Sequence, residues 1–129
     1  MPLSGDAQPH PKEAAVKAGR PRRYRRKVAS PKRWAALWDE KVRGRVCRVC
    51  RQGTDFRTME AHHLVPRGIG GDDVADNLVA VHLDCHYLLT IGDSVALRIL
   101  GLSLTDAEYA YIVAKLGEGG MQRLFGVDR

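Results

Sequence analysis

The sequence predicts a small α+β domain that is flanked by helices and preceded by a disordered basic arm. Two short segments, 58–65 and 78–82, have the length of strands and enclose a loop rich in proline, glycine and aspartate. Apolar residues at helical spacing occur both before and after this pair. Residues 1–29 contain too few apolar side chains to bury a core. We therefore expect an arm at 1–29 and a domain at 30–129, with a motif core at 45–100.

Basic residues are concentrated in the arm. Residues 1–33 hold ten Lys or Arg and two acidic residues, whereas the whole chain has a net charge of +6, so residues 34–129 are slightly acidic. Each phosphate neutralised by a cation releases counterions. We therefore expect the arm to bind nucleic acid through Arg22, Arg23, Arg25, Arg26 and Lys27. A solvated tail without a partner and a mitochondrial transit peptide are the alternatives that the composition leaves open.

Composition also bounds the class of protein. No run approaches the roughly 18 apolar residues that span a bilayer, and no apolar secretory segment opens the sequence. The cysteine count, three, is odd, and all three cysteines stand at metal-ligand spacing, which disfavours a disulfide framework. We expect a soluble, cytoplasmic protein without a membrane segment.

The first helix is expected to begin after Ser30, a good N-cap, with Pro31 at its first position and Gly44 as its stop. Its apolar residues form one stripe at i, i+3, i+4 and i+8, namely Trp34, Leu37, Trp38 and Val42. Because aromatic side chains bury large areas, we expect both tryptophans in the core.

Two further helices are expected after the second strand. Asp84 is a candidate N-cap for a helix starting at Cys85, whose apolar side would comprise Leu88, Leu89, Ile91 and Val95. Thr105 and Glu108 form a capping box for a C-terminal helix at about 105–117, which Gly117 should end. We expect this last helix to contribute packing and little chemistry.

Residues 47–86 contain all three cysteines and four of the five histidines. Cys47 and Cys50 form one pair with a two-residue gap, and His82 and Cys85 form another. Three thiolates and one imidazole make a closed tetrahedral zinc set, which is typical of a structural metal. If His82 instead served another site, the zinc would lack its fourth ligand; Cys85, three residues later, favours the pair.

A second group, which the zinc does not need, comprises His62, His63, Asn77 and His86. Neighbours on a strand point to opposite faces, so His62 and His63 can share a site only where the strand ends. Pro66 suggests that it ends there. In the first turn of a helix, Cys85 and His86 would point about 100° apart, so one could reach the zinc and the other this second site.

These residues lie within a wider pattern. Ala61-His62-His63-Leu64-Val65-Pro66, Gly70-Gly71, Asn77-Leu78 and Cys85-His86 resemble, in order and spacing, the signature of the HNH endonuclease family, and of its small phage-type members in particular. The resemblance covers about a third of the chain and implies a ββα-metal core stapled by zinc. Members with such a zinc usually have four cysteines, whereas position 82 here is histidine.

The resemblance also implies roles. His63 matches the general base, and His62 and His86 match the ligands of one catalytic divalent cation, for which Mg²⁺, Mn²⁺, Ni²⁺ and Zn²⁺ remain open. Asn77 matches the residue that holds the loop and so orients the base. Arg67 is a candidate phosphate contact. The loop carboxylates could be further metal ligands, but we expect them to be solvated: Asp72, Asp73 and Asp76.

The sequence thus favours a metal-dependent endonuclease that hydrolyses DNA, most readily double-stranded DNA. The resemblance to phage-type members further implies a phage or mobile-element role beside DNA-packaging machinery. The alternative is a non-catalytic, zinc-dependent nucleic-acid-binding module. A zinc deaminase is excluded because no H-x-E pairs with P-C-x-x-C. Sequence preference, nicking against double-strand cleavage, DNA against RNA and oligomeric state stay open.

Overall fold

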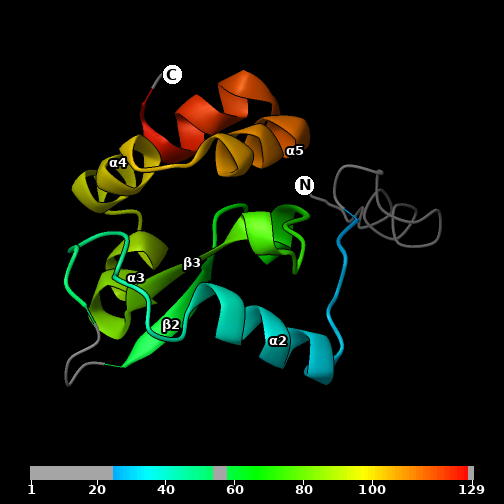
Figure 1. Cartoon of the computed structure of the whole chain (residues 1–129). Helices are drawn as coiled ribbons and strands as arrows, with labels where there is room; N and C mark the ends of the chain where they lie inside the picture. Colours follow the sequence, from blue (N-terminus) through cyan, green and yellow to red (C-terminus); the bar gives the residue numbers. More distant parts are fainter. Residues whose placement is uncertain (1–24, 54–57, 128–129) are drawn as a thin grey trace, which may run out of the picture.

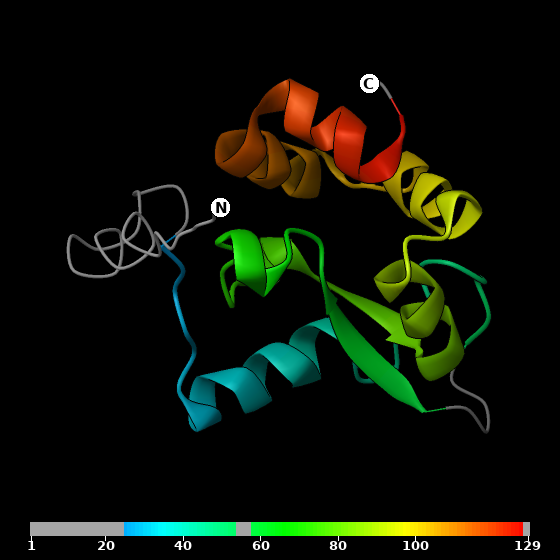
Figure 2. The same cartoon turned by 180° about the vertical axis from the view of Figure 1, so that it is seen from behind.

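The computed structural model describes residues 25–53 and 58–127. Its elements, in chain order, are α2 (Pro31–Lys41), β2 (Met59–His63), η2 (Arg67–Ile69), η3 (Ala75–Asn77), β3 (Leu78–His82), α3 (Leu83–Thr90), α4 (Ser94–Leu102) and α5 (Asp106–Phe125). Figures 1 and 2 show the two strands in the middle of the molecule, with α2 on one side and α4 and α5 on the other. The predicted α+β class is confirmed.

The strands form an antiparallel pair in which Met59 lies opposite His82 and His63 lies opposite Leu78. Every residue of β3 is buried. The chain passes directly from β3 into α3, which packs against both strands and completes a ββα unit. The β2–β3 loop, residues 64–77, contains the short helices η2 and η3, and η3 packs against α5.

Helix α2 begins as expected. The Ser30 side chain accepts a hydrogen bond from the Arg33 N–H, and Leu37 is buried. Trp38 packs against the core, but Trp34 does not, because its ring lies against His63. The expectation that both tryptophans belong to the core was therefore wrong for Trp34.

Helix α3 begins at Leu83, two residues earlier than expected, with His82 as its N-cap. It ends at Thr90, and the chain turns at Gly92, which has φ 80°, into the separate helix α4. Only Leu89 of the predicted apolar side is buried; the side chains of Leu88, Ile91 and Val95 are exposed. No single helix among the described residues is long and apolar enough to cross a bilayer, although α3 and α4 together, bent by 107°, reach that length and composition.

Helix α5 starts with the predicted capping box, in which Thr105 and Glu108 satisfy each other's backbone N–H groups. Gly117 has φ 75° and ψ 170°, so it interrupts the helix as expected. It does not end the helix, because the chain resumes helical geometry and continues to Phe125. Met121 and Phe125 in this second part are buried in the core, which explains why the helix continues.

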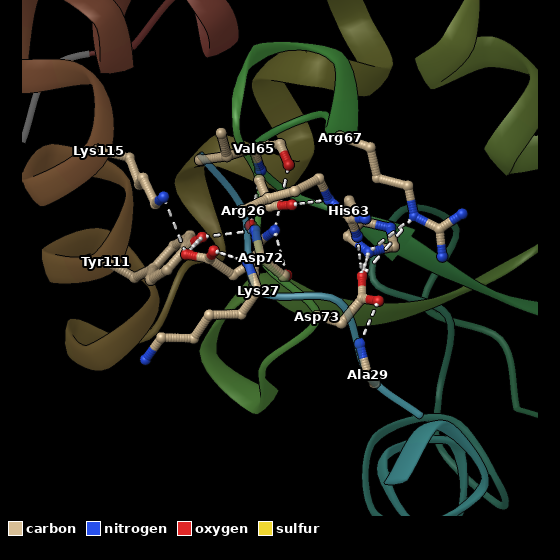
Figure 3. Close-up of polar contacts among 12 residues, drawn as sticks. Arg26, Lys27, Ala29, His63, Val65, Arg67, Asp72, Asp73, Tyr111 and Lys115 are labelled. Carbon is tan, nitrogen blue, oxygen red and sulfur yellow. Dashed lines mark hydrogen bonds and ion pairs between the residues drawn. The ribbon is translucent and has the colours of Figure 1, made fainter. Parts of the chain in front are cut away.

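The expected arm is described only at its end. Residues 1–24, with Arg22 and Arg23, lie outside the described residues. Residues 25–29, here called the arm segment, were expected to be disordered but run as an extended segment beside the β2–β3 loop (Figure 3). The backbone of this segment is hydrogen-bonded to the loop, since Asp73 N–H donates to Lys27 O at 2.8 Å. A prediction of disorder from composition does not take such long-range bonds into account.

Candidate active site and metal centre

The four predicted zinc ligands come together. One donor atom from each of Cys47, Cys50, His82 and Cys85 lies within 4.8 Å of the others, and these residues are the only group of three or more metal-type side chains so placed in the described part of the chain. The cysteine pair lies on the turn that follows α2, His82 ends β3, and Cys85 lies in the first turn of α3. The cluster therefore joins three parts of the fold.

The His82 ring is held in one tautomer. Its Nε2 lies 3.1 Å from the Gly53 carbonyl, which can only accept, so Nε2 carries the hydrogen. Its Nδ1 then keeps a lone pair and lies 3.3 Å from Cys50 Sγ. A metal-binding histidine is commonly oriented in this way by a carbonyl on its other nitrogen.

The thiols also suit a cation. Burial raises the pKa of Cys47, but backbone N–H groups, including those of His82 and Val49 at 3.4 Å, outweigh it and lower that pKa. Burial and the neighbouring thiols raise the pKa of Cys85 to about 12. Thiolates so close together repel one another, and a bound divalent cation would offset their negative charge. The donor set therefore fits a structural zinc.

Arg48, on the same turn, connects this centre to α5. Its guanidinium donates to both Glu108 oxygens, at 2.9 and 2.7 Å, and to the Ser103 carbonyl at 2.8 Å. Burial raises the pKa of Glu108, but Arg48 and the Thr105 N–H outweigh it and lower that pKa. Through this ion pair, helix α5 is fixed against the turn that carries the cysteine pair.

On β2, Glu60 and His62 lie on one face because strand residues alternate. The rings of His62 and His86 are 5.1 Å apart between centroids and nearly perpendicular, at 78°. His86 Nδ1 lies 2.5 Å from Glu60 Oε1, and because a carboxylate only accepts, Nδ1 donates. In the neutral ring of His86, this leaves the lone pair on Nε2. Sequence reasoning did not identify Glu60; its only signal is the two-residue spacing from His62.

His62 is prepared to act as a neutral donor. Burial, followed by the neighbouring imidazoles of His86 and His63, lowers the pKa of His62 to about 3. Its lone pair is therefore available at neutral pH, which is the form that binds metal.

His63, the last residue of β2, is held on two sides. Its Nε2 lies 2.8 Å from Asp73 Oδ1, and its ring stacks on Trp34 with centroids 5.8 Å apart and planes 7° apart. The contact with Asp73 assigns the ring hydrogen to Nε2 and leaves the lone pair on Nδ1. Arg67 Nε also lies 3.4 Å from His63 Nε2, but both nitrogens would be donors there, so the shorter contact of 2.8 Å to Asp73 decides the position of the ring hydrogen. The Arg67 guanidinium lies 5.4 Å from the Trp34 ring centroid.

The charge state of His63 follows from its surroundings. Burial lowers the pKa of His63, the hydrogen bond to Asp73 opposes this shift, and the cation Arg67 adds to it. The net direction is downward, so the ring is neutral at neutral pH. A neutral imidazole can accept a proton from water.

Asn77 fastens the β2–β3 loop from inside. Its buried amide accepts from Val65 N–H at 2.7 Å and donates to Val65 O at 3.1 Å and Asp72 O at 3.0 Å. Gly71 allows the same closure, because a Cβ at this position would lie 1.7 Å from Val65 O. Asn77 thus holds the loop closed behind His63.

Two of the loop carboxylates are buried, contrary to expectation, while Asp76 is exposed. Asp72 accepts from the Lys27 N–H at 2.6 Å and from the Tyr111 hydroxyl at 2.7 Å, and its carboxylate lies 3.1 Å from Lys115 Nζ (Figure 3). Burial raises the pKa of Asp72, but these donors outweigh it and lower that pKa. The arm segment and α5 thus cover a loop that composition alone predicted to be solvated.

The histidines of the second group share one cavity of about 710 Å³, which is lined by His62, His63, His86, Trp34, Trp38 and Arg67 among others. The strand ends at His63, so two adjacent histidines can face one space despite their opposite starting directions. Cys85 belongs to the metal centre and His86 to this cavity, as the first-turn geometry predicted. Of the predicted phosphate contacts, Arg25 and Lys27 are exposed, and the Arg26 side chain is bonded to the loop.

Residues 47–90 match the family model described as HNH endonuclease. The matched segment spans the zinc-type centre, both strands, the β2–β3 loop and α3. Searches among curated proteins and among solved structures found no match to the chain.

Proposed function

We propose that the chain hydrolyses DNA with His63 as the base, because residues 47–90 match the HNH endonuclease family model, and members of that family are phosphodiester hydrolases that bind DNA. In this proposal, His62 and His86 hold one divalent cation, and Cys47, Cys50, His82 and Cys85 hold a structural zinc. The observation that carries the proposal is that three histidines line one cavity, with His63 bonded to Asp73 and His86 bonded to Glu60.

His63 is suited to accept a proton from water. Its Nε2 hydrogen is bonded to Asp73, so the Nδ1 lone pair is the basic site. Its lowered pKa keeps the ring neutral at neutral pH. Asn77 keeps the loop residue Asp72 close to Val65 and thereby maintains the wall of the cavity behind the ring.

His62 and His86 are suited to bind a cation, since burial keeps His62 neutral and Glu60 orients the ring of His86. When bound, a divalent cation supplies charge that offsets the scissile phosphate and the leaving 3′ oxygen. Two imidazoles near a carboxylate suit Mg²⁺, Mn²⁺, Ni²⁺ or Zn²⁺. The tetrahedral Cys₃His set is a closed site and serves stability instead.

The basic residues before and beside the cavity provide the DNA-binding surface in this proposal. Arg67 lies at the cavity beside His63, where it can contact the scissile phosphate. The arm, with Arg22, Arg23, Arg25, Arg26 and Lys27, would neutralise neighbouring phosphates of double-stranded DNA. From the resemblance alone, we extend the proposal to a phage or mobile-element role beside DNA-packaging machinery.

A plasmid-cleavage assay tests the proposal. Zinc-loaded protein is freed of loosely bound metal and then supplied with Mg²⁺, Mn²⁺, Ni²⁺ or Zn²⁺ one at a time. We expect cleavage only with an added ion and expect it to end when the ion is chelated. Binding of DNA without cleavage under every ion would contradict the proposal and favour a non-catalytic zinc module.

A further inference from the structure

The arm segment and the β2–β3 loop are tied together at several points. Arg26 Nε donates to Gly71 O at 2.7 Å, and Lys27 N–H donates to Asp72 Oδ1 at 2.6 Å. Asp73 N–H donates back to Lys27 O at 2.8 Å. Lys115 of α5 adds a bond to the Arg25 carbonyl at 3.0 Å. The bonds to the loop span about 45 positions of sequence and the Lys115 bond spans 90, so they place the arm segment and do not arise from local chain geometry.

Asp73 is the link between this segment and the catalytic cavity. Its side chain is 4% exposed, so almost all of its surface is covered by its partners. Oδ2 accepts from the Ala29 N–H at 2.9 Å, while Oδ1 binds His63 Nε2 at 2.8 Å and pairs with Arg26. Figure 3 shows Asp73 between the His63 ring and the Ala29 backbone. Both oxygens are used, which argues against Asp73 as a metal ligand.

We propose that Asp73 is a positioning residue for His63, and that the arm segment holds Asp73 for that task, so that the arm is part of the catalytic apparatus as well as a DNA-binding surface. This inference rests on the proposed function of His63 as the base.

The physical reason is that a neutral imidazole has two tautomers and can rotate about its bond to the chain. The carboxylate of Asp73 selects the tautomer with hydrogen on Nε2, and the Trp34 ring limits rotation from the other side. Asn77 acts differently, because its bonds go to backbone groups of the loop and none goes to the ring. Loss of Asp73 should therefore leave a folded loop with a poorly oriented base.

Variants at position 73 separate this role from a structural one. In steady-state cleavage of a DNA duplex, we expect Asp73→Ala to lower kcat by up to about 100-fold, the order that a misplaced reacting group costs, while KM changes little. Asp73→Asn retains an oxygen acceptor for His63 and should recover part of the loss. Asp76→Ala removes an exposed carboxylate from the same loop and serves as the matched control, with wild-type kcat.

Variants of the arm test the second half of the inference. The Arg26 side chain binds the loop, whereas the Lys27 side chain is exposed and extends away from Asp73 (Figure 3). Arg26→Ala should therefore lower kcat and raise KM, and Lys27→Ala, which removes the same charge, should raise KM alone. Equal effects of the two substitutions on kcat would overturn the role of the arm.

Nitrogen chemical shifts of the His63 ring give a readout that does not depend on activity. In mildly alkaline buffer, where the ring is neutral, we expect the Nε2–H tautomer in the wild type and a mixture in Asp73→Ala. Circular dichroism and zinc content show whether each variant is folded. If Asp73→Ala does not fold, the kcat and the tautomer of Asp73→Asn and Arg26→Ala test the inference in its place.

Wild-type kcat or an unchanged tautomer in folded Asp73→Ala would overturn the inference. A wild type that cleaves no DNA would overturn the proposed function instead, and the spectra would still decide the role of Asp73.

Discussion

Glu60 on β2 accepts a hydrogen bond of 2.5 Å at Oε1 from Nδ1 of His86 on α3. A carboxylate in this position orients a metal-binding imidazole and raises its basicity. We expect Glu60→Ala to raise the concentration of added divalent ion needed for half-maximal cleavage by about 10- to 100-fold. Titration of the ion in the cleavage assay measures this shift.

Glu60→Gln is the matched control, because its amide oxygen still accepts from His86. It should require less added ion than the alanine variant. Structural zinc should remain in both, since Glu60 is not among the residues of the cysteine cluster. An alanine variant with the wild-type ion requirement would remove Glu60 from the site.

Gly71 and Gly68 differ in the space around them although both lie in the β2–β3 loop. A Cβ on Gly71 would overlap the Val65 carbonyl, whereas a Cβ on Gly68 would meet nothing within 4 Å. We expect Gly71→Ala to lower both thermal stability and cleavage because the loop cannot close behind His63. Gly68→Ala should change Tm and kcat little. Similar losses in the two variants would show that the close approach at Gly71 is not the cause.

Cys50→Ser should remove the structural metal and lower Tm together, because zinc binding contributes directly to the free energy of folding. Zinc content per chain and a thermal melt on the same sample test this. His82→Cys is the informative comparison, since four thiolates also form a tetrahedral zinc site and should retain the metal. A Cys50→Ser protein with full zinc content and wild-type Tm would contradict the assignment of the cluster.

Glu108 should make stability depend on acid pH. Its folded-state pKa is lowered, so its stabilising contribution is present above its unfolded pKa of about 4.3 and is lost as pH falls through the lower folded value. We expect Glu108→Gln, which can keep the capping box, to cost on the order of 2 kcal/mol near neutral pH. The Tm gap to the wild type should narrow as pH falls below about 4.3 and close once pH lies below the folded-state pKa. A gap independent of pH would show that charge is not the cause.

The ligands of the metal centre could be predicted because their chemistry appears in local spacing. Two pairs with two-residue gaps, Cys47 with Cys50 and His82 with Cys85, are sufficient to indicate one tetrahedral site. The strand 78–82 was predicted to the residue because a short apolar run between a loop and a helix start has clear limits. Both signals depend on few residues close together in sequence.

Other features depend on contacts that no local pattern contains. The helical spacing of Trp34 is compatible both with a side chain buried in the core and with a side chain beside His63. Only the tertiary fold distinguishes these two positions. Asp73 stands in a polar loop, so its burial follows only once Arg26 and Ala29, more than 40 residues earlier, are placed against it. Glu60 carries no motif, and its role appears only when α3 places His86 beside β2.

The most direct test of the account compares His63→Ala with the wild type in three measurements on the same samples: duplex cleavage with an added divalent ion, DNA binding in the presence of chelator, and zinc content. The account predicts that cleavage is lost while DNA affinity and zinc content stay at wild-type values, because His63 touches neither the zinc cluster nor the exposed side chains of the arm segment, residues 25–29. Cleavage at the wild-type rate by His63→Ala would contradict the central claim that this histidine activates water.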